Sequence, residues 1–228
     1  MKEIIILFDL DGTLIDSTDA ILESFAAAYE SFGSMSPQRE AIEALIGYPL
    51  DVMFSRLGVS ESLVKDHVDA YKRHYRVISR EKTRLLPGAK EAIEAARSFA
   101  RLGVVTTKTA RYSKELLEHM DLMHYFEVLI GREDVVNPKP HPEPICLALK
   151  KMNASVENVW MVGDTLLDVE AARAAGVEPV AVACGYGETK LLANECKMVF
   201  DDAKSAIDGI ALKVSLPKKL ALRAAGLQ

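Results

Sequence analysis

Short apolar runs separated by helical patterns limit the fold of this chain more tightly than any other feature of its sequence. They occupy residues 4–8, 102–106, 128–131, 159–163 and 179–183. Runs of this length, rich in β-branched residues, predict strands that are buried on both faces of a sheet. Helical patterns at residues 89–99 and 166–175 lie between them. Because strand and helix alternate, we expect an α/β fold with a doubly wound parallel sheet.

The strand signal disappears between Asp16 and Leu86, where amphipathic helices replace it. One apolar stripe joins Ile21, Leu22, Phe25 and Tyr29, and another joins Val64, Val68, Tyr71, Tyr75 and Ile78. Stripes with this spacing predict the core of a small helical bundle. Pro87-Gly88 then restarts the α/β pattern, with the proline suited to the first turn of a helix.

We therefore divide the chain into a discontinuous α/β core, an inserted all-helical domain and a tail. The core is predicted at residues 1–16 and 86–212, and the helical insert at residues 17–85. The tail, residues 213–228, has four basic residues and no acidic one. We interpret it as a solvated or loosely docked segment.

The net charge of -5 excludes a broad basic surface, so neither nucleic acid nor an anionic membrane is an expected partner. No apolar run is long enough for a signal-peptide core or a membrane span, and we expect a cytoplasmic protein. The three cysteines, Cys146, Cys184 and Cys196, are widely and irregularly spaced. This spacing fits neither a disulfide framework nor a zinc site.

Two aspartates follow the first predicted strand directly, in the sequence Asp9-Leu10-Asp11-Gly12-Thr13-Leu14. Ligands of open parallel sheets bind at the carboxyl ends of the strands, and Gly12 lets the chain turn sharply there. Two carboxylates this close would raise each other's pKa unless a hard cation such as Mg²⁺ accepted them as ligands. The alternative reading of the motif alone is a turn with two solvated aspartates.

Three further signals occur, in order, at or after later strands. Thr106 ends its strand and offers a hydroxyl and the following N–H groups to a phosphoryl oxygen. Lys139 lies in a proline-stiffened loop that could hold an ammonium against phosphate charge. Asp164 ends another strand, with Asp168 one helical turn beyond, and these carboxylates would complete a metal site.

With these four motifs, at residues 9–14, 104–108, 137–140 and 162–168, the chain resembles the haloacid dehalogenase-like hydrolase superfamily over residues 1–212. The resemblance implies a Rossmann-like core and Mg²⁺ as cofactor. It also implies that Asp9 is the nucleophile that forms an aspartyl-phosphate, and that Asp11 is the general acid and base. Asp11 would also bind the metal through its main-chain carbonyl.

The same resemblance assigns the remaining motif residues. Thr106 and Lys139 would hold the phosphoryl oxygens, Asp164 would bind the metal, and Asp168 would support it directly or through another ligand. Asp11 argues against the dehalogenase and phosphonatase branches, which lack a carboxylate at that position. Phosphate esters or anhydrides therefore remain as substrates.

The helical insert resembles the family's mobile cap, from which substrate specificity is expected. Residues 46–50 lie where related caps place a substrate loop, which makes Gly47 and Tyr48 candidate substrate-binding residues, together with Thr107 in the core. Gly-x-Pro could equally be a simple connection between helices. The closest resemblance is to the phosphoglycolate phosphatases and their pyrophosphatase relatives, so we expect a small phosphorylated metabolite as substrate.

Alternatives remain open at this point. Thr107 stands where many phosphoglycolate phosphatases have asparagine, which keeps an inorganic pyrophosphatase possible, and a β-phosphoglucomutase-like mutase ranks third because the cap loop lacks that group's arginine. A phosphorylatable receiver module is a non-enzymatic alternative, although receivers are about half as long and have no inserted domain. The five histidines have no metal-ligand spacing, and the Gly185-Tyr186-Gly187 loop has no assigned role. The pattern does not distinguish a monomer from a homodimer.

Overall fold

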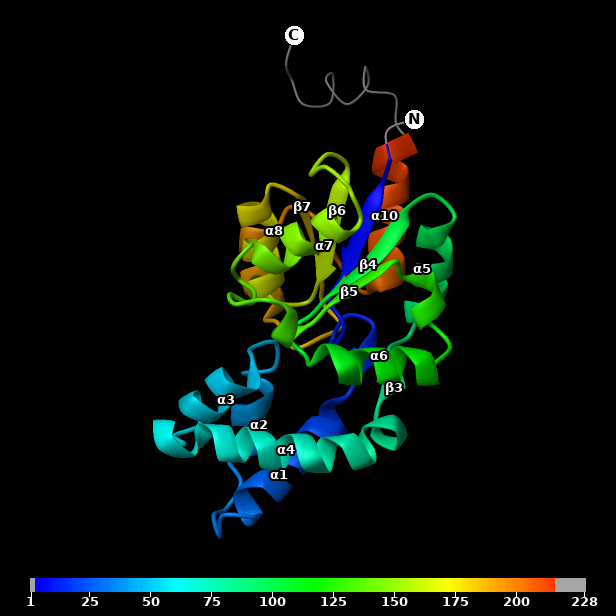
Figure 1. The fold of residues 1–228 in the computed structure, drawn as a ribbon. Helices are drawn as coiled ribbons and strands as arrows, with labels where there is room; N and C mark the ends of the chain where they lie inside the picture. The colour runs from blue at the N-terminus through cyan, green and yellow to red at the C-terminus, as the bar shows by residue number, and fades with distance from the viewer. Residues whose placement is uncertain (1–2, 216–228) are drawn as a thin grey trace.

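The computed structural model describes residues 3–215 and contains a six-stranded parallel sheet in the order β5-β4-β1-β6-β7-β8 (Figure 1). The strands are β1 Ile5–Phe8, β4 Arg101–Val105, β5 Val128–Ile130, β6 Val159–Gly163, β7 Glu178–Val182 and β8 Val199–Phe200. The central strand β1 pairs in parallel with β4 on one side and β6 on the other. This topology confirms the predicted α/β fold with a parallel sheet.

The five predicted strands are all present, and their ends shift by at most one residue. The sixth strand, β8, has no counterpart in the sequence analysis. It contains two half-buried residues and pairs only with β7, at the edge of the sheet. A two-residue segment is too short to give a periodic signal, and its strand conformation depends on its neighbour.

Helices cover both faces of the sheet, as the alternation of side chains along β1 requires. Ile6 and Phe8 pack against α5, α6 and α10, whereas Ile5 and Leu7 pack against α7 and α8. The α-helices that follow the insert in the described residues are α5 Ala89–Arg97, α6 Ala110–His119, α7 Glu143–Lys151, α8 Leu166–Ala175, α9 Thr189–Glu195 and α10 Ala203–Ser215. Alternate residues of a strand point to opposite faces, so one apolar run forms the centre of two cores.

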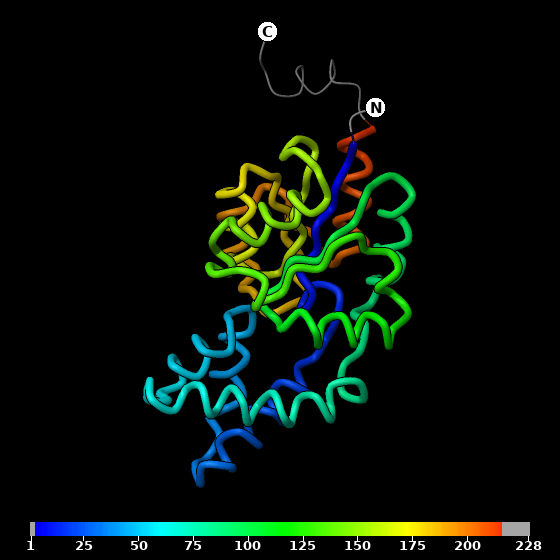
Figure 2. Tube along the Cα trace, viewed as in Figure 1, coloured from blue at the N-terminus to red at the C-terminus, as the bar shows by residue number. Residues whose placement is uncertain are grey.

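The insert consists of α1 Thr18–Glu30, α2 Arg39–Glu43, α3 Leu50–Arg56 and α4 Glu61–Lys82, and it lies beyond the carboxyl ends of the strands (Figures 1 and 2). The two predicted stripes meet in its core, where Phe25 of α1 contacts Tyr71 of α4 with 5.2 Å between ring centroids. The division into core, insert and tail at the stated residues stays a prediction.

Two details of the expected boundary are wrong. The segment between Asp16 and Leu86 is not free of strands at its ends, because β2 Ile15–Asp16 and β3 Arg84–Leu85 pair as an antiparallel ribbon. Pro87 does not lie in the first turn of a helix, because α5 begins at Ala89 after Gly88 in a left-handed conformation. The two runs of the ribbon are too short to be read from sequence alone.

The end of α10 includes Lys213, which contacts Glu178 of β7 at 3.2 Å. The predicted tail therefore starts inside a helix, and residues 216–228 lie outside the described residues. Among the described helices, none combines the length and the hydropathy that crossing a bilayer requires.

Candidate active site

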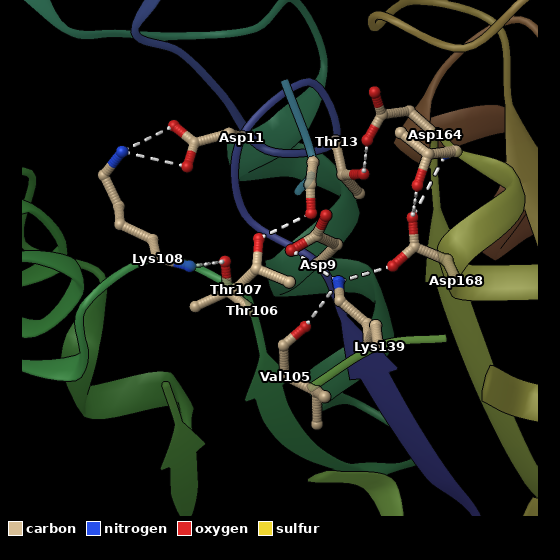
Figure 3. Close-up of polar contacts among 12 residues, drawn as sticks. Asp9, Asp11, Thr13, Val105, Thr106, Thr107, Lys108, Lys139, Asp164 and Asp168 are labelled. Carbon is tan, nitrogen blue, oxygen red and sulfur yellow. Dashed lines mark hydrogen bonds and ion pairs between the residues drawn. The ribbon is translucent and has the colours of Figure 1, made fainter. Parts of the chain in front are cut away.

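The polar residues predicted at the strand ends meet at one edge of the sheet (Figure 3). Asp9 follows β1, Thr106 follows β4 and Asp164 follows β6, and these are three adjacent strands of the sheet. Lys139 comes from the loop before α7, and Asp168 from the first turn of α8. The parallel topology therefore places side chains that are far apart in sequence within one buried cluster.

Asp9, Asp164 and Asp168 each offer a carboxylate oxygen, and these oxygens all lie within 4.8 Å of one another. All three side chains are buried. Burial is the main reason that the pKa of Asp9 rises to about 6, with Asp168 adding to the increase and Lys139 opposing it. Burial and the charge of Asp9 likewise hold the pKa of Asp164 well above its usual range. Two buried acids with raised pKa values, beside a third buried carboxylate, form an environment that a cation would stabilise.

Asp9 also has an oxygen without a hydrogen bond. Its Oδ1 is buried and lies 3.0 Å from Lys139 Nζ, but it has no hydrogen-bond partner among the described residues. Buried polar atoms are rarely left in this state, and an ion is one of the groups that satisfies them. Carboxylate oxygens are the ligands that Mg²⁺ prefers, so the residues present fit a divalent cation.

Lys139 supplies positive charge to this cluster. Its ammonium lies 2.5 Å from Asp168 Oδ1 and 3.0 Å from Asp9 Oδ1, and it donates to the carbonyl of Val105 at 3.1 Å. Burial alone would lower the pKa of Lys139, but Asp168 and Asp9 outweigh it and raise that pKa. The lysine therefore stays charged and is held beside the predicted nucleophile.

Asp164 is oriented by two neighbouring segments. The hydroxyl of Thr13 donates to its Oδ1 at 3.0 Å, and the main-chain N–H of Tyr186 donates to its Oδ2 at 2.8 Å. A Cβ on Gly12 would lie 2.3 Å from Asp164 Oδ2, and one on Gly185 would lie 2.1 Å from it. Only glycine fits at these two positions, so the Gly185-Tyr186-Gly187 loop, to which sequence gave no role, forms one wall around Asp164.

Asp168 has two structural partners. Its Oδ2 accepts hydrogen bonds from the main-chain N–H and the hydroxyl of Thr165, at 3.1 and 2.8 Å, in a capping box that begins α8. Its Oδ1 accepts from Lys139 at 2.5 Å. Asp168 therefore fixes the lysine as well as the helix start, and its role as a metal ligand stays a prediction.

Asp11 lies apart from the acidic cluster. Figure 3 shows its carboxylate pointing away from Asp9 and toward Lys108, whose ammonium lies 3.0 and 2.9 Å from the two oxygens. The Ser17 hydroxyl donates to the same carboxylate. Lys108 was not among the predicted site residues, because the sequence Thr106-Thr107-Lys108 gives no indication of where a lysine after a strand end will point.

Thr106 and Thr107 have different surroundings. Thr106 is buried, and its hydroxyl oxygen accepts a hydrogen bond from the main-chain N–H of Lys108 at 3.2 Å. The hydroxyl of Thr107 donates to the carbonyl of Gly47 at 2.8 Å, which joins the core to the insert. Gly47 has a φ of +108°, and a Cβ there would lie 3.2 Å from Thr165 Cγ2. The close approach of the two domains at this point therefore favours glycine.

A cavity of about 310 Å³ lies between the insert and the core. It is lined by Asp11, Ile21, Ile46, Gly47, Tyr48, Leu50, Asp51, Met53, Val68, Tyr71, Lys72, Tyr75, Thr107, Lys108, Thr109, Tyr112, Arg132 and Glu133. Tyr48 is on this wall, with the Arg56 guanidinium 4.0 Å from its ring centroid. Tyr71 and Tyr75, expected only as bundle core, are buried and also reach the cavity. Their spacing on a helix does not reveal that the bundle ends at a cavity.

Comparisons with known proteins agree with this geometry. A family model described as haloacid dehalogenase-like hydrolase matches residues 6–182. A protein named "Probable phosphatase IndB" from Dickeya dadantii is 32% identical over 214 residues, which cover 91% of this chain and 93% of that protein. A phosphoglycolate phosphatase from Photorhabdus laumondii is 31% identical, with 92% of this chain and 94% of that protein covered.

Solved structures show the same fold. A putative haloacid dehalogenase-like hydrolase from Bacteroides fragilis has a TM-score of 0.84 and 26% identity, covering 89% of this chain and 99% of that one. A predicted phosphoglycolate phosphatase from Haemophilus somnus has a TM-score of 0.83 and 25% identity, covering 95% of this chain and 99% of that one. These matches confirm the family resemblance inferred from the four motifs.

Proposed function

The chain belongs to the haloacid dehalogenase-like hydrolases, and on that basis we propose that it is a magnesium-dependent phosphatase acting through an aspartyl-phosphate on Asp9. The observation that carries this proposal is the buried cluster of Asp9, Asp164 and Asp168, with Lys139 beside it and one oxygen of Asp9 without a hydrogen bond. A nucleophile beside a cation site and a fixed ammonium is suited to attack on a phosphate group.

The substrate class follows from the relatives. Relatives that match more than nine tenths of this chain are named as a probable phosphatase and as phosphoglycolate phosphatases. We propose that this chain hydrolyses a small phosphomonoester, with phosphoglycolate as the first substrate to test. We further propose that residues 17–85 act as a cap, because the cavity lies between these helices and the core.

In the first half-reaction, a carboxylate oxygen of Asp9 attacks phosphorus and the bond from phosphorus to the ester oxygen breaks. Asp11 gives its proton to the departing oxygen, which leaves as an alcohol. Thr106 and Lys139 hold the phosphoryl oxygens during this transfer. A magnesium ion held by Asp9, Asp164 and the main-chain carbonyl of Asp11 would supply positive charge that lowers the repulsion between carboxylate and phosphate.

In the second half-reaction, water attacks the phosphorus of the aspartyl-phosphate. Asp11, now a carboxylate, accepts a proton from that water, the bond between phosphorus and the Asp9 oxygen breaks, and inorganic phosphate leaves. Asp9 is again a carboxylate and Asp11 again carries a proton, so the cycle balances. One residue serves as acid and then as base because the departing oxygen takes up a proton in the first half-reaction and the attacking water gives one up in the second.

The test is phosphate release from phosphoglycolate, ethyl phosphate, sugar phosphates, nucleotides and pyrophosphate, with Mg²⁺ and with a chelator. We expect release from at least one ester with Mg²⁺, none with the chelator, and none from Asp9→Asn or Asp11→Asn. Retention of near-normal rates by either variant would contradict the assigned roles. Preference for pyrophosphate over every ester would instead support the pyrophosphatase alternative.

A further inference from the structure

Lys108 lies at the boundary between the acid–base residue and the cavity. Its side chain is 10% exposed and that of Asp11 is 12% exposed, and both residues line the cavity wall. The ammonium contacts both oxygens of Asp11 and lies 4.6 Å from the centroid of the Tyr75 ring. Asp11 is the only acidic side chain that forms an ion pair with Lys108 within residues 3–215. The charge of Lys108 therefore depends on one carboxylate.

The proposed reaction requires the Asp11 carboxylate to move away from Lys108. Asp11 must carry a proton to the departing oxygen, which is bonded to the phosphorus that Asp9 attacks. In the structure, its carboxylate points away from Asp9 and is held by Lys108 and Ser17 (Figure 3). Asp11 therefore has to leave Lys108 in order to act, and the ammonium then loses the carboxylate that it contacts.

Loss of its partner is unfavourable for a cation that is only 10% exposed, because little of its solvation is restored. The neighbouring groups offer little compensation. The ring of Tyr75, which is buried and faces the ammonium, attracts a cation but carries no charge. The other acidic residues of the cavity wall are engaged elsewhere: Asp51 lies 3.9 Å from Arg132, and Glu133 accepts from the Ala110 N–H at 2.9 Å.

We propose that Lys108 selects the substrate, by binding a carboxylate of the leaving group in place of the Asp11 carboxylate. This inference rests on the proposed function and names the substrate class for the same site: phosphate esters whose alcohol carries a carboxylate close to the ester oxygen. An incoming carboxylate releases Asp11 for proton transfer and keeps the ammonium paired. A neutral alcohol leaves Asp11 held by Lys108.

The position of Lys108 limits the length of the leaving group. A carboxylate that replaces the one on Asp11 takes a place directly beside the acid that protonates the ester oxygen. The inference therefore requires a leaving group in which few carbon atoms separate the carboxylate from the ester oxygen. Glycolate satisfies this condition, whereas a carboxylate at the far end of a four-carbon chain does not.

The experiment compares three esters that share a primary phosphate: phosphoglycolate, ethyl phosphate and 4-phosphooxybutyrate. For the wild-type protein we expect kcat/KM for phosphoglycolate to exceed the other two values by about 100-fold or more, because a site built to pair a polar group rejects analogues that lack it. In Lys108→Met, kcat/KM for phosphoglycolate should fall about 100-fold further than the value for ethyl phosphate, so that the preference for the carboxylate ester disappears.

The control is Lys65→Met, which breaks an exposed lysine–aspartate pair on α4, where Lys65 lies 2.9 Å from Asp69. It removes the same charge from a residue of the insert that does not line the cavity, and we expect it to leave the ratio of the three values unchanged. Lys108→Arg keeps the charge and should keep the preference for phosphoglycolate. Product inhibition offers a test without any variant, since glycolate should inhibit the wild-type protein far more strongly than glycolamide.

The outcomes separate the two proposals. An equal loss on all three esters in Lys108→Met would mean that Lys108 only positions Asp11, and it would overturn the substrate inference while leaving the phosphatase intact. Equal inhibition by glycolate and glycolamide would overturn it as well. No magnesium-dependent release from any ester by the wild-type protein would refute the proposed function itself.

Discussion

Replacing Asp9 with asparagine should stabilise the metal-free protein while removing its activity. The side chain is buried, and its pKa is raised from 3.8 to about 6, chiefly by burial and in spite of the attraction of Lys139. At about 1.4 kcal/mol per pKa unit, the ionised form destabilises the native state at pH 7.5 by about 3 kcal/mol. Asparagine has nearly the same shape and no charge, so most of this cost should disappear.

The pH dependence follows from the direction of the shift. A carboxyl whose pKa is higher in the folded state than in the unfolded one favours folding below pH 3.8, and this contribution is lost as the pH rises through 6. The stability advantage of Asp9→Asn over the wild-type protein should therefore shrink from about 3 kcal/mol at pH 7.5 to about 1 kcal/mol at pH 4.5. Because both proteins share every other titrating group, the difference between them reports Asp9 together with its effect on Asp164, whose pKa the charge of Asp9 raises.

The assay is unfolding by urea and by heat, in the presence of a chelator, at both pH values. For a chain of this size, 3 kcal/mol corresponds to a difference of about 6–12 °C in Tm. Mg²⁺ at 1,000 times Kd should reverse the order, because it stabilises the wild-type protein by about 4.1 kcal/mol and the variant has lost a ligand. A variant that is less stable than the wild type without metal, or a difference that does not change with pH, would refute the reasoning.

Three further predictions concern the surroundings of Asp9. Lys139→Met should lower the free energy of unfolding by about 3–5 kcal/mol, because it leaves two buried carboxylates without their cation; urea unfolding measures this, and a loss below 1 kcal/mol would contradict the buried ion pairs. Gly185→Ala should displace Asp164 and thereby raise the Mg²⁺ concentration for half-maximal activity about 10-fold or more. Gly176→Ala is the control, because a Cβ at that position has no neighbouring atom within 4 Å, and it should leave that concentration unchanged. Thr107→Val should raise KM a few-fold, because it removes the hydrogen bond to the Gly47 carbonyl that joins insert and core. The Tm measured in the presence of a chelator should change little. An unchanged KM would indicate that this contact does not affect substrate binding.

The central sheet could be predicted from sequence because burial on both faces leaves a strong signal. Strands such as Ile5–Phe8 are continuous apolar runs, and the helices between them are long enough to show their period. The residues at the strand ends could be placed together because parallel strands end at the same edge. β8 and the β2–β3 ribbon could not be predicted, since segments of two residues have no period and are held by their neighbours.

The site was less predictable where it depends on side-chain direction. The motif places Asp11 two residues after Asp9, but it does not tell that the two carboxylates point apart or that Lys108 holds one of them. Tyr71 and Tyr75 lie on an apolar stripe whose simplest interpretation is bundle core, and they are indeed buried. Whether a buried stripe also borders a cavity depends on what packs against it, which one sequence does not contain.

The β2–β3 ribbon suggests how the inserted helices could be removed. Ile15 pairs with Leu85 and Asp16 with Arg84, so the two points where the chain leaves and re-enters the core are direct neighbours. An Asn-Gly turn matches the twist of such an antiparallel pair and could join Asp16 to Arg84. Since the two cores around the sheet contain no residue between 16 and 84, the shortened chain should keep its interior. It would present Asp9, Lys139 and Asp164 at an open surface, a minimal scaffold onto which other lids could be grafted.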